Sequence, residues 1–236
     1  MAKESVVGYI LHTRAFKETS LLIDLFSREQ GRFSLLAKGV KRKNSQAQRA
    51  ILQPFNLLNI EYTGRSELKT LCYSELVSNP TRLPNRALAC GYYMNELLSR
   101  SVQEWQEFCQ LFQLYHESIQ VLINCEDFAP TLRDFEVSLL DELGVAPQWF
   151  TDIHGGDICR DSIYHFIPEQ GFELVILKQQ NNEFGLSHKG FIGEAILSLG
   201  GKCYNAKTQK ICQQITQLLL RQIIGDRPLE SRKLWL

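Results

Sequence analysis

The sequence of 236 residues lacks the cysteine arrangement of a disulfide framework or a structural zinc site. Its seven cysteines are an odd number, and no two of them form a CxxC pair. Structural zinc sites draw their ligands from such closely spaced pairs, and small secreted domains use an even set of cysteines. We therefore expect free thiols, no bound metal and no cofactor.

Long hydrophobic runs are also missing. The longest span only a few residues, such as 218–220, whereas a membrane-spanning helix needs about 20. The first residues lead into an alternating segment and not into the apolar region of a signal peptide. We therefore expect a protein of the cytoplasm with no membrane contact.

The motifs of common enzyme classes are absent too. The chain contains no GxSxG, GxxxxGK[ST], GxGxxG or HExxH segment. The sharpest catalytic candidate is a group at His154, Asp157, Asp161 and His165, which could bind a divalent metal in a phosphodiesterase. Its spacing matches no known ligand pattern, so ordinary polar loop residues explain it better. We expect a protein that is not an enzyme.

Acidic residues are missing from one long stretch of the chain. None occurs between Glu29 and Glu61, and six cations occupy that gap: Arg32, Lys38, Lys41, Arg42, Lys43 and Arg49. The overall net charge of zero conceals this asymmetry. Residues 1–80 hold 12 Lys and Arg against 7 Asp and Glu, a balance of +5, and the remaining 14 against 19 give −5. Such a division indicates a segregated electrostatic surface.

The first 80 residues carry the alternating pattern of β-strands. Turn residues separate the apolar segments, and one longer connection, the basic loop at residues 38–49, follows the third strand. Five short strands with this spacing favour a small Greek-key barrel of the OB type over a partly open sandwich. The expected strands are 5–13, 19–27, 32–37, 57–62 and 68–76.

From Asn85 the apolar period changes from two to 3.6 residues, which predicts helices. Three amphipathic stretches cover approximately 85–105, 108–123 and 130–143, and two more follow around 191–199 and 209–224. A short hairpin is expected at 163–177. The fold class is therefore α+β, with an OB-type domain at residues 1–80 and a mainly helical domain at 81–236.

The basic loop admits two interpretations on charge alone. It is either a solvated loop or a site for a phosphate backbone, where Lys and Arg displace condensed counterions without fixed base geometry. The barrel beneath it favours nucleic acid, and RNA remains an alternative to DNA. Phe33, Phe55, Tyr62 and Tyr73 lie on or near these strands, where core packing is more common than base stacking.

The third helical stretch places Arg133 beside an apolar stripe. A cation at the edge of an apolar groove suits a peptide with an acidic, aromatic end, although a surface Arg on an amphipathic helix needs no such role. The stripe is formed by Leu132, Phe135, Leu139 and Leu140.

Short motifs along the whole chain together resemble the RecO family of bacterial DNA repair proteins. Each motif is weak alone, and their order and spacing carry the resemblance. They are His12-Thr13-Arg14, Glu18-Thr19-Ser20, Gly31-Arg32, Ala37-Lys38-Gly39, Leu52-Gln53-Pro54-Phe55, Leu68-Lys69-Thr70-Leu71, Tyr93-Met94-Asn95-Glu96-Leu97-Leu98, Leu132-Arg133-Asp134-Phe135-Glu136 and Leu229-Glu230-Ser231-Arg232-Lys233-Leu234.

The resemblance implies a recombination mediator that acts at the nucleoid. Such a protein binds single- and double-stranded DNA, anneals complementary strands and, with RecR, helps load RecA onto DNA coated by single-strand-binding protein. The expected DNA-binding residues are Arg14, Arg32, Lys38, Lys41, Arg42, Lys43, Arg49 and Lys69. The acidic tail of single-strand-binding protein is expected at Leu132, Arg133, Phe135, Leu139 and Leu140. Some members carry a four-cysteine zinc site, of which this chain keeps only Cys159, with His154 nearby.

Overall fold

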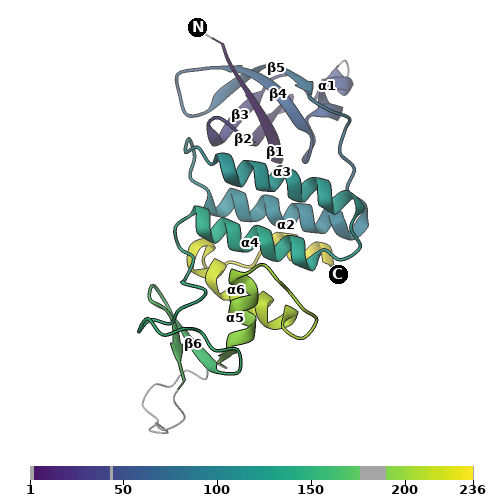
Figure 1. Ribbon diagram of the computed structural model, residues 1–236. Helices are drawn as coiled ribbons and strands as arrows, with labels where there is room; N and C mark the ends of the chain where they lie inside the picture. Colours follow the sequence, from purple (N-terminus) through teal and green to yellow (C-terminus); the bar gives the residue numbers. More distant parts are fainter. Residues whose placement is uncertain (1–2, 43–44, 176–189, 236) are drawn as a thin grey trace. The chain divides into compact units, whose positions relative to one another are not determined.

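The computed structural model describes residues 3–42, 45–175 and 190–235. Contacts divide the chain into two compact units. Unit 1 comprises residues 1–128 together with 226–236, and unit 2 comprises residues 129–225. Unit 1 contains the barrel, two long helices and the C-terminal segment, and unit 2 combines helices with a small sheet (Figure 1).

Five strands in unit 1 form a closed barrel in the order β1-β2-β3-β5-β4. The first half of β1 pairs with β4 and its second half pairs with β2, while a short parallel pairing of β3 with β5 completes the closure. The predicted OB-type barrel is confirmed. The strands are β1 (Glu4–Phe16), β2 (Ser20–Ser27), β3 (Gly31–Ala37), β4 (Leu57–Thr63) and β5 (Lys69–Leu76).

The barrel buries one face of β1, β2, β3 and β4 and, on β1 and β2, part of the other face as well. Ile10 and Leu25 lie in the barrel core. The adjacent Tyr9 contacts Tyr115 with ring centroids 5.1 Å apart, and Phe26 contacts Phe112 at 5.6 Å. Both partners lie on α3 (Cys109–Asn124). Helix α3 therefore covers the outer surface of β1 and β2, as Figure 1 shows.

Helix α2 (Asn85–Ser101) joins the barrel, α3 and the C-terminal segment. The buried Asn95 amide donates to the Leu11 carbonyl at 2.8 Å and accepts from the Tyr115 hydroxyl at 2.6 Å. The 3-10 helix η2 (Glu230–Trp235) packs on α2, where Glu96 accepts hydrogen bonds from the N–H groups of Glu230 and Ser231, both at 2.9 Å. These contacts make residues 226–235 part of unit 1, although unit 2 precedes them in the chain.

In its described residues, unit 2 contains three helices and a three-stranded antiparallel sheet in the order β7-β6-β8. Helix α4 contributes the stripe of Leu132, Phe135, Leu139 and Leu140 to its core. The predicted α+β class is confirmed, although the end of the predicted hairpin, residues 176–177, lies outside the described residues. The elements are α4 (Ala129–Glu142), β6 (Ile163–Ile167), β7 (Gly171–Leu174), β8 (Phe191–Ile192), α5 (Gly193–Gly200) and α6 (Gln209–Ile224).

The compact units do not divide where composition changes. The predicted boundary at residue 80 follows the last barrel strand, whereas the units separate between residues 128 and 129. Helices α2 and α3 belong to unit 1 because their apolar faces cover the barrel. A short helix α1 (Gln46–Ile51) also stands inside the loop between β3 and β4, where no helix was predicted. None of the helices in the described ranges is long and apolar enough to cross a membrane.

Candidate nucleic-acid interface

Two cationic segments lie together at one end of the barrel. The backbone N–H of Lys41 donates to the carbonyl of Thr19 at 3.0 Å, which brings the basic loop against the turn between β1 and β2. Exposed cations come from both sides of this contact. We call this set the basic end; its members are Arg14 and Lys17 from the hairpin and Lys38, Lys41 and Arg42 from the loop.

Turns and an apolar anchor shape the described part of the loop. Val40 is buried in the barrel core, and the Arg42 N–H and the Ser45 hydroxyl both donate to the Gly39 carbonyl, at 3.1 and 3.2 Å. Gly39 has φ +75°, a conformation that favours glycine. These bonds and the buried Val40 give the described residues of the loop a defined course.

The remaining loop residues complete the connection to β4. Arg49 is exposed in the last turn of α1, and Lys43 lies outside the described residues. Lys17 was not among the predicted DNA-binding residues. The signal that could have found it was its place in the turn of the first predicted hairpin, because hairpin and loop meet at the same end of a barrel.

Arg32 belongs to a different part of the barrel and is already engaged. It lies at the start of β3, and its side chain is 17% exposed. Its guanidinium donates to Asp24 at 3.2 Å and to the Val102 carbonyl at 3.1 Å, and it pairs with Glu104 at 3.4 Å. Burial raises the pKa of Asp24, and the charge of Arg32 opposes that shift. The structure thus places Arg32 in a contact between the barrel and the segment after α2, away from the basic end.

Lys69 is likewise separate from the basic end. Its ammonium lies 4.8 Å from the ring centroid of Trp105 and donates to the Gly64 carbonyl at 3.2 Å. Trp105 in turn stacks on Phe33, with centroids 4.5 Å apart and the planes 22° from parallel. Phe33 is fully buried, so it supports Trp105 from within the barrel and offers no face to a base.

The other aromatic candidates divide by exposure. Phe55 and Tyr62 are buried, whereas Tyr73 is 47% exposed on β5. Tyr73 donates its hydroxyl to Glu75, which also accepts from Asn59. These neighbours give the outer surface of β4 and β5 acidic and amide groups, which do not favour a phosphate backbone.

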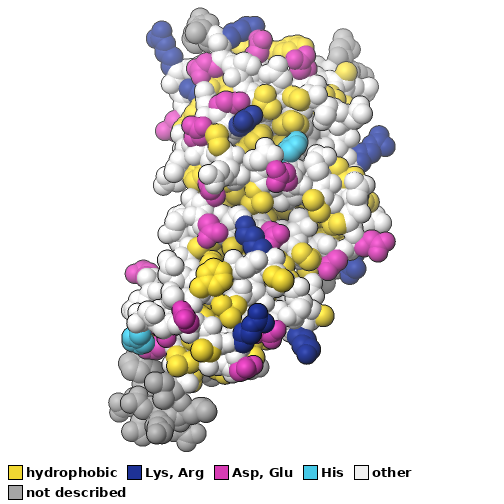
Figure 2. Space-filling model, in the orientation of Figure 1, with side chains coloured by type: hydrophobic (Ala, Val, Ile, Leu, Met, Phe, Trp, Pro, Cys, Tyr) yellow, Lys and Arg dark blue, Asp and Glu magenta, His cyan; other side chains and the backbone are white. Residues whose placement is uncertain are grey.

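Charges of both signs are interspersed on the face of the molecule drawn in Figure 2. A protein that binds nucleic acid through a broad field would show one sign over a large area. The exposed cations Arg14, Lys17, Lys38, Lys41 and Arg42 are instead brought together by the contact of the β1–β2 turn with the basic loop, so the candidate interface is local.

The candidate enzyme residues do not form a metal site. His154 Nε2 lies 3.3 Å from Glu173, and Asp152 accepts the backbone N–H groups of His154 and Gly156 at 2.9 and 2.8 Å. Within the described ranges, no cluster of three or more His, Cys, Asp or Glu side chains could hold a metal ion. His154, Asp157, Asp161 and His165 therefore do not gather into one, and Asp152 is the residue that organises this loop.

The predicted partner-binding stripe on α4 is a packing face. Leu132, Arg133, Phe135, Leu139 and Leu140 are each less than a tenth exposed. The Arg133 guanidinium donates to Glu136 at 2.6 Å and to the Thr216 hydroxyl on α6 at 2.8 Å. The interpretation of Arg133 as a cation at the edge of an open groove thus needs correction. The carboxylate of Glu136 permits its burial, and the apolar stripe is covered within unit 2.

The closed OB-type barrel with cations at one end places the chain in a class of small barrel proteins. Comparison with known families shows which family of that class it belongs to. Residues 1–80 match the family model described as Recombination protein O N terminal, and residues 85–233 match Recombination protein O C terminal. The chain belongs to the RecO family of DNA repair proteins.

Individual relatives match the chain over nearly its whole length. The protein of Alteromonas mediterranea named DNA repair protein RecO is 34% identical over 100% of this chain and 98% of its own length. Proteins of the same name from Pasteurella multocida and Erwinia tasmaniensis are 35% and 36% identical, each over 97% of this chain and over 92% and 91% of their own lengths. The predicted family membership is confirmed.

Proposed function

We propose that the chain binds single- and double-stranded DNA at the basic end and acts as a recombination mediator without catalysis of its own. The observation that carries this proposal is the meeting of two cationic segments, the β1–β2 turn and the basic loop, at one end of an OB-type barrel. Lys and Arg side chains on exposed turns reach phosphates without a fixed register, as binding without sequence preference requires.

The five cations of the basic end set the scale of the electrostatic contribution. Each cation that neutralises a phosphate of a single strand contributes about −0.7 to the log–log dependence of affinity on salt. Full engagement of Arg14, Lys17, Lys38, Lys41 and Arg42 would therefore give a slope of about −3.5. Neutralisation of two strands on this surface lowers their mutual repulsion, which supports annealing of complementary strands.

In this proposal the protein works at the nucleoid with three partners. It helps load RecA onto DNA coated by single-strand-binding protein, and it does so together with RecR. Membership of the RecO family supports these partners. We place the contact with the acidic tail of single-strand-binding protein in the helical part of the chain, and the burial of Arg133 removes that side chain as its exposed anchor.

The test removes Lys38, Lys41 and Arg42 together by substitution with Ala. We expect weaker binding of single-stranded DNA and a salt slope reduced by about 2, because each lost phosphate contact removes about 0.7. A control with the same loss of charge replaces the exposed Arg65, Lys207 and Lys210.

The two triple variants must differ if the proposal holds. Equal salt slopes in the loop variant and the wild type would overturn the assignment of the basic end. The same variants are then compared in annealing of strands precoated with single-strand-binding protein, with and without RecR. Competition between DNA and RNA of one sequence distinguishes an RNA-binding barrel, because only RNA presents a 2′-hydroxyl.

A further inference from the structure

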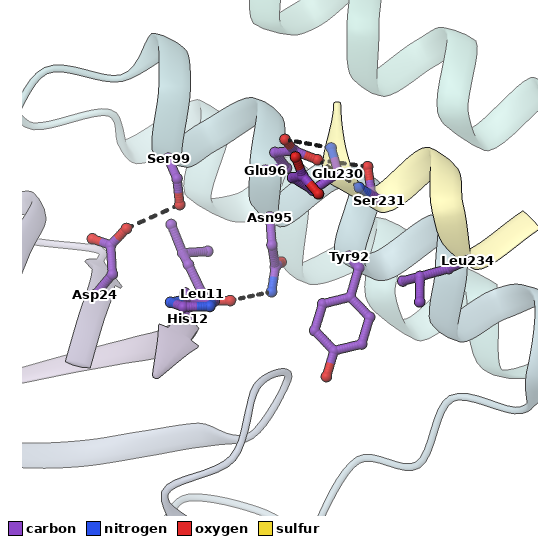
Figure 3. A pocket seen from close by; sticks show the side chains of 10 residues that line it. All are labelled: Leu11, His12, Asp24, Tyr92, Asn95, Glu96, Ser99, Glu230, Ser231 and Leu234. Carbon is purple, nitrogen blue, oxygen red and sulfur yellow. Dashed lines mark hydrogen bonds between the residues drawn. The ribbon is translucent and has the colours of Figure 1, made fainter. Parts of the chain in front are cut away.

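A pocket of about 610 Å³ opens in unit 1 between the barrel, α2 and η2. Figure 3 shows its walls: Leu11, His12 and Asp24 on the barrel side, and Tyr92 and Leu234 across the opening. The Tyr92 ring contacts Phe55 edge-on at 5.2 Å, which fixes its orientation. The pocket therefore combines apolar and aromatic walls with polar groups, as sites for flat heterocyclic ligands do.

A bulge in β1 places this pocket beside the basic end. The pairing of β1 with β2 shifts between Ile10 and His12, which leaves Leu11 as an extra residue in the strand. Before the bulge the strand's outer face is covered by α3, and beyond it His12 and then Arg14 are exposed. Residues two apart on a strand share a face, so Arg14 follows His12 along the same surface. Bulges often redirect side chains in this way next to functional sites.

The polar groups of the pocket disfavour the phosphate of a nucleotide and favour the hydrogen-bond donors of its base. Its lining contains the carboxylates of Asp24, Glu96 and Glu230 and contains neither Lys nor Arg, so a phosphate is disfavoured there. A carboxylate has about four acceptor positions. The hydroxyl of Ser99 and the guanidinium of Arg32 donate to Asp24, and further acceptor capacity remains for a donor from a ligand.

We propose that this pocket receives an unpaired nucleobase from a DNA strand whose backbone lies on the basic end. The inference rests on the proposed function. Stacking on aromatic rings is available to every base, but the carboxylates require a donor. Cytosine, adenine and guanine carry an exocyclic amino group with two N–H donors. Thymine has only its N3–H, which lies between two carbonyl oxygens that a carboxylate repels. The pocket therefore favours bases with an amino group over thymine, whereas the basic end binds all strands alike.

The experiment compares oligodeoxycytidine with oligothymidine of about 16 nucleotides, a length within the range that an OB fold covers. The wild type should bind the cytosine strand more tightly at every salt concentration. Tyr92→Leu should lower affinity for that strand about tenfold, because a stacked base contributes roughly 1–3 kcal/mol. The salt slope should stay unchanged, since the phosphate contacts remain. Tyr73→Leu, which removes the exposed tyrosine of β5, is the matched control.

A second variant guards against loss of the fold in the first. Ser99→Met places a larger side chain at the pocket wall and leaves the Tyr92 ring in place; it should also abolish the preference for cytosine. The proposal is overturned if the wild type binds both strands equally, or if Tyr92→Leu behaves like Tyr73→Leu. In that case DNA binding that still depends on Lys41 and Arg42 would leave the proposed function intact.

A protein partner could occupy the pocket in place of a nucleobase, and the two occupants can be distinguished by experiment. A basic side chain from a protein partner would also suit the carboxylates and the tyrosine ring. A labelled lysine- and arginine-rich peptide tests this occupant directly. Binding of the peptide that is lost in Tyr92→Leu, together with unchanged DNA binding in that variant, would overturn the nucleobase assignment.

Discussion

Replacement of Arg32 by Gln should destabilise unit 1 and leave DNA binding unchanged. The side chain joins β3 to Asp24 and to the Val102 carbonyl, and only 17% of it is exposed. Hydrogen bonds to charged groups contribute about 1.5–3 kcal/mol each when buried. Since the exposed fraction is small and Ser99 still donates to Asp24, we expect a loss of about 2 kcal/mol in the free energy of unfolding.

The assay is denaturant unfolding combined with a salt titration of DNA affinity. A loss of this size should lower the melting temperature by about 4–8 °C. Lys38→Ala provides the opposite case: its stability should change by less than about 0.5 kcal/mol and its salt slope by about 0.7. Combining Arg32→Gln with Asp24→Asn should give less than the sum of the two losses, because the residues share one contact. A reduced salt slope in Arg32→Gln with unchanged stability would refute the reasoning and make Arg32 a phosphate contact.

Three further changes test other parts of the structure. Burial alone would raise the pKa of Glu96, but the hydrogen bonds from Ser231 and Glu230 and the charge of Arg100 together outweigh it and hold that pKa below its usual value. The ionised Glu96 therefore stabilises the attachment of the C-terminal segment above the ordinary pKa of 4.5, and this stabilisation is lost as the pH falls through the lowered pKa. Limited proteolysis should then release residues 226–235 in acid. In Glu96→Gln it should release them at neutral pH also. Asp152→Ala should cost about 1–2 kcal/mol and speed amide exchange in its loop, where two N–H groups lose their acceptor. Gly31→Ala should cost at least about 2 kcal/mol in urea unfolding, because its φ is +67° and a Cβ would lie 1.7 Å from the Gln106 carbonyl oxygen.

Most of the barrel could be predicted because its strands alternate and are separated by turns. The helices over the barrel were harder to place, since local periodicity does not say what an apolar face covers. One signal was present: Tyr9, Ile10 and Leu11 are consecutive and apolar, and so are Leu25 and Phe26. Neighbouring apolar residues indicate a strand buried on both faces. That pattern would have assigned a covering helix to the barrel.

Only part of the candidate site could be predicted, because the sequence pattern does not show which residues are close in space. The loop cations could be predicted from the acid-free stretch, but the residues that lie beside them in space are determined by long-range contacts. The meeting of Lys41 with Thr19, the pairing of Arg32 with Asp24 and the burial of Arg133 against Glu136 all depend on three-dimensional packing. Charge alone therefore grouped Arg32 with the loop cations, and the family resemblance added Lys69, although the structure separates both from the basic end.

The return of residues 226–235 to α2 has a consequence for synthesis on the ribosome. Domains generally fold from the N-terminus as the chain emerges. The first part of unit 1 is synthesised first, but its last segment follows all of unit 2 in the chain. Glu96 therefore cannot accept its hydrogen bond from Ser231 until translation has passed residue 231. Chains interrupted within unit 2 would lack the helix that forms one wall of the pocket. In such nascent chains the side of α2 around Glu96 would be exposed to chaperones and proteases. Incomplete chains would therefore be recognised and degraded in preference to complete ones.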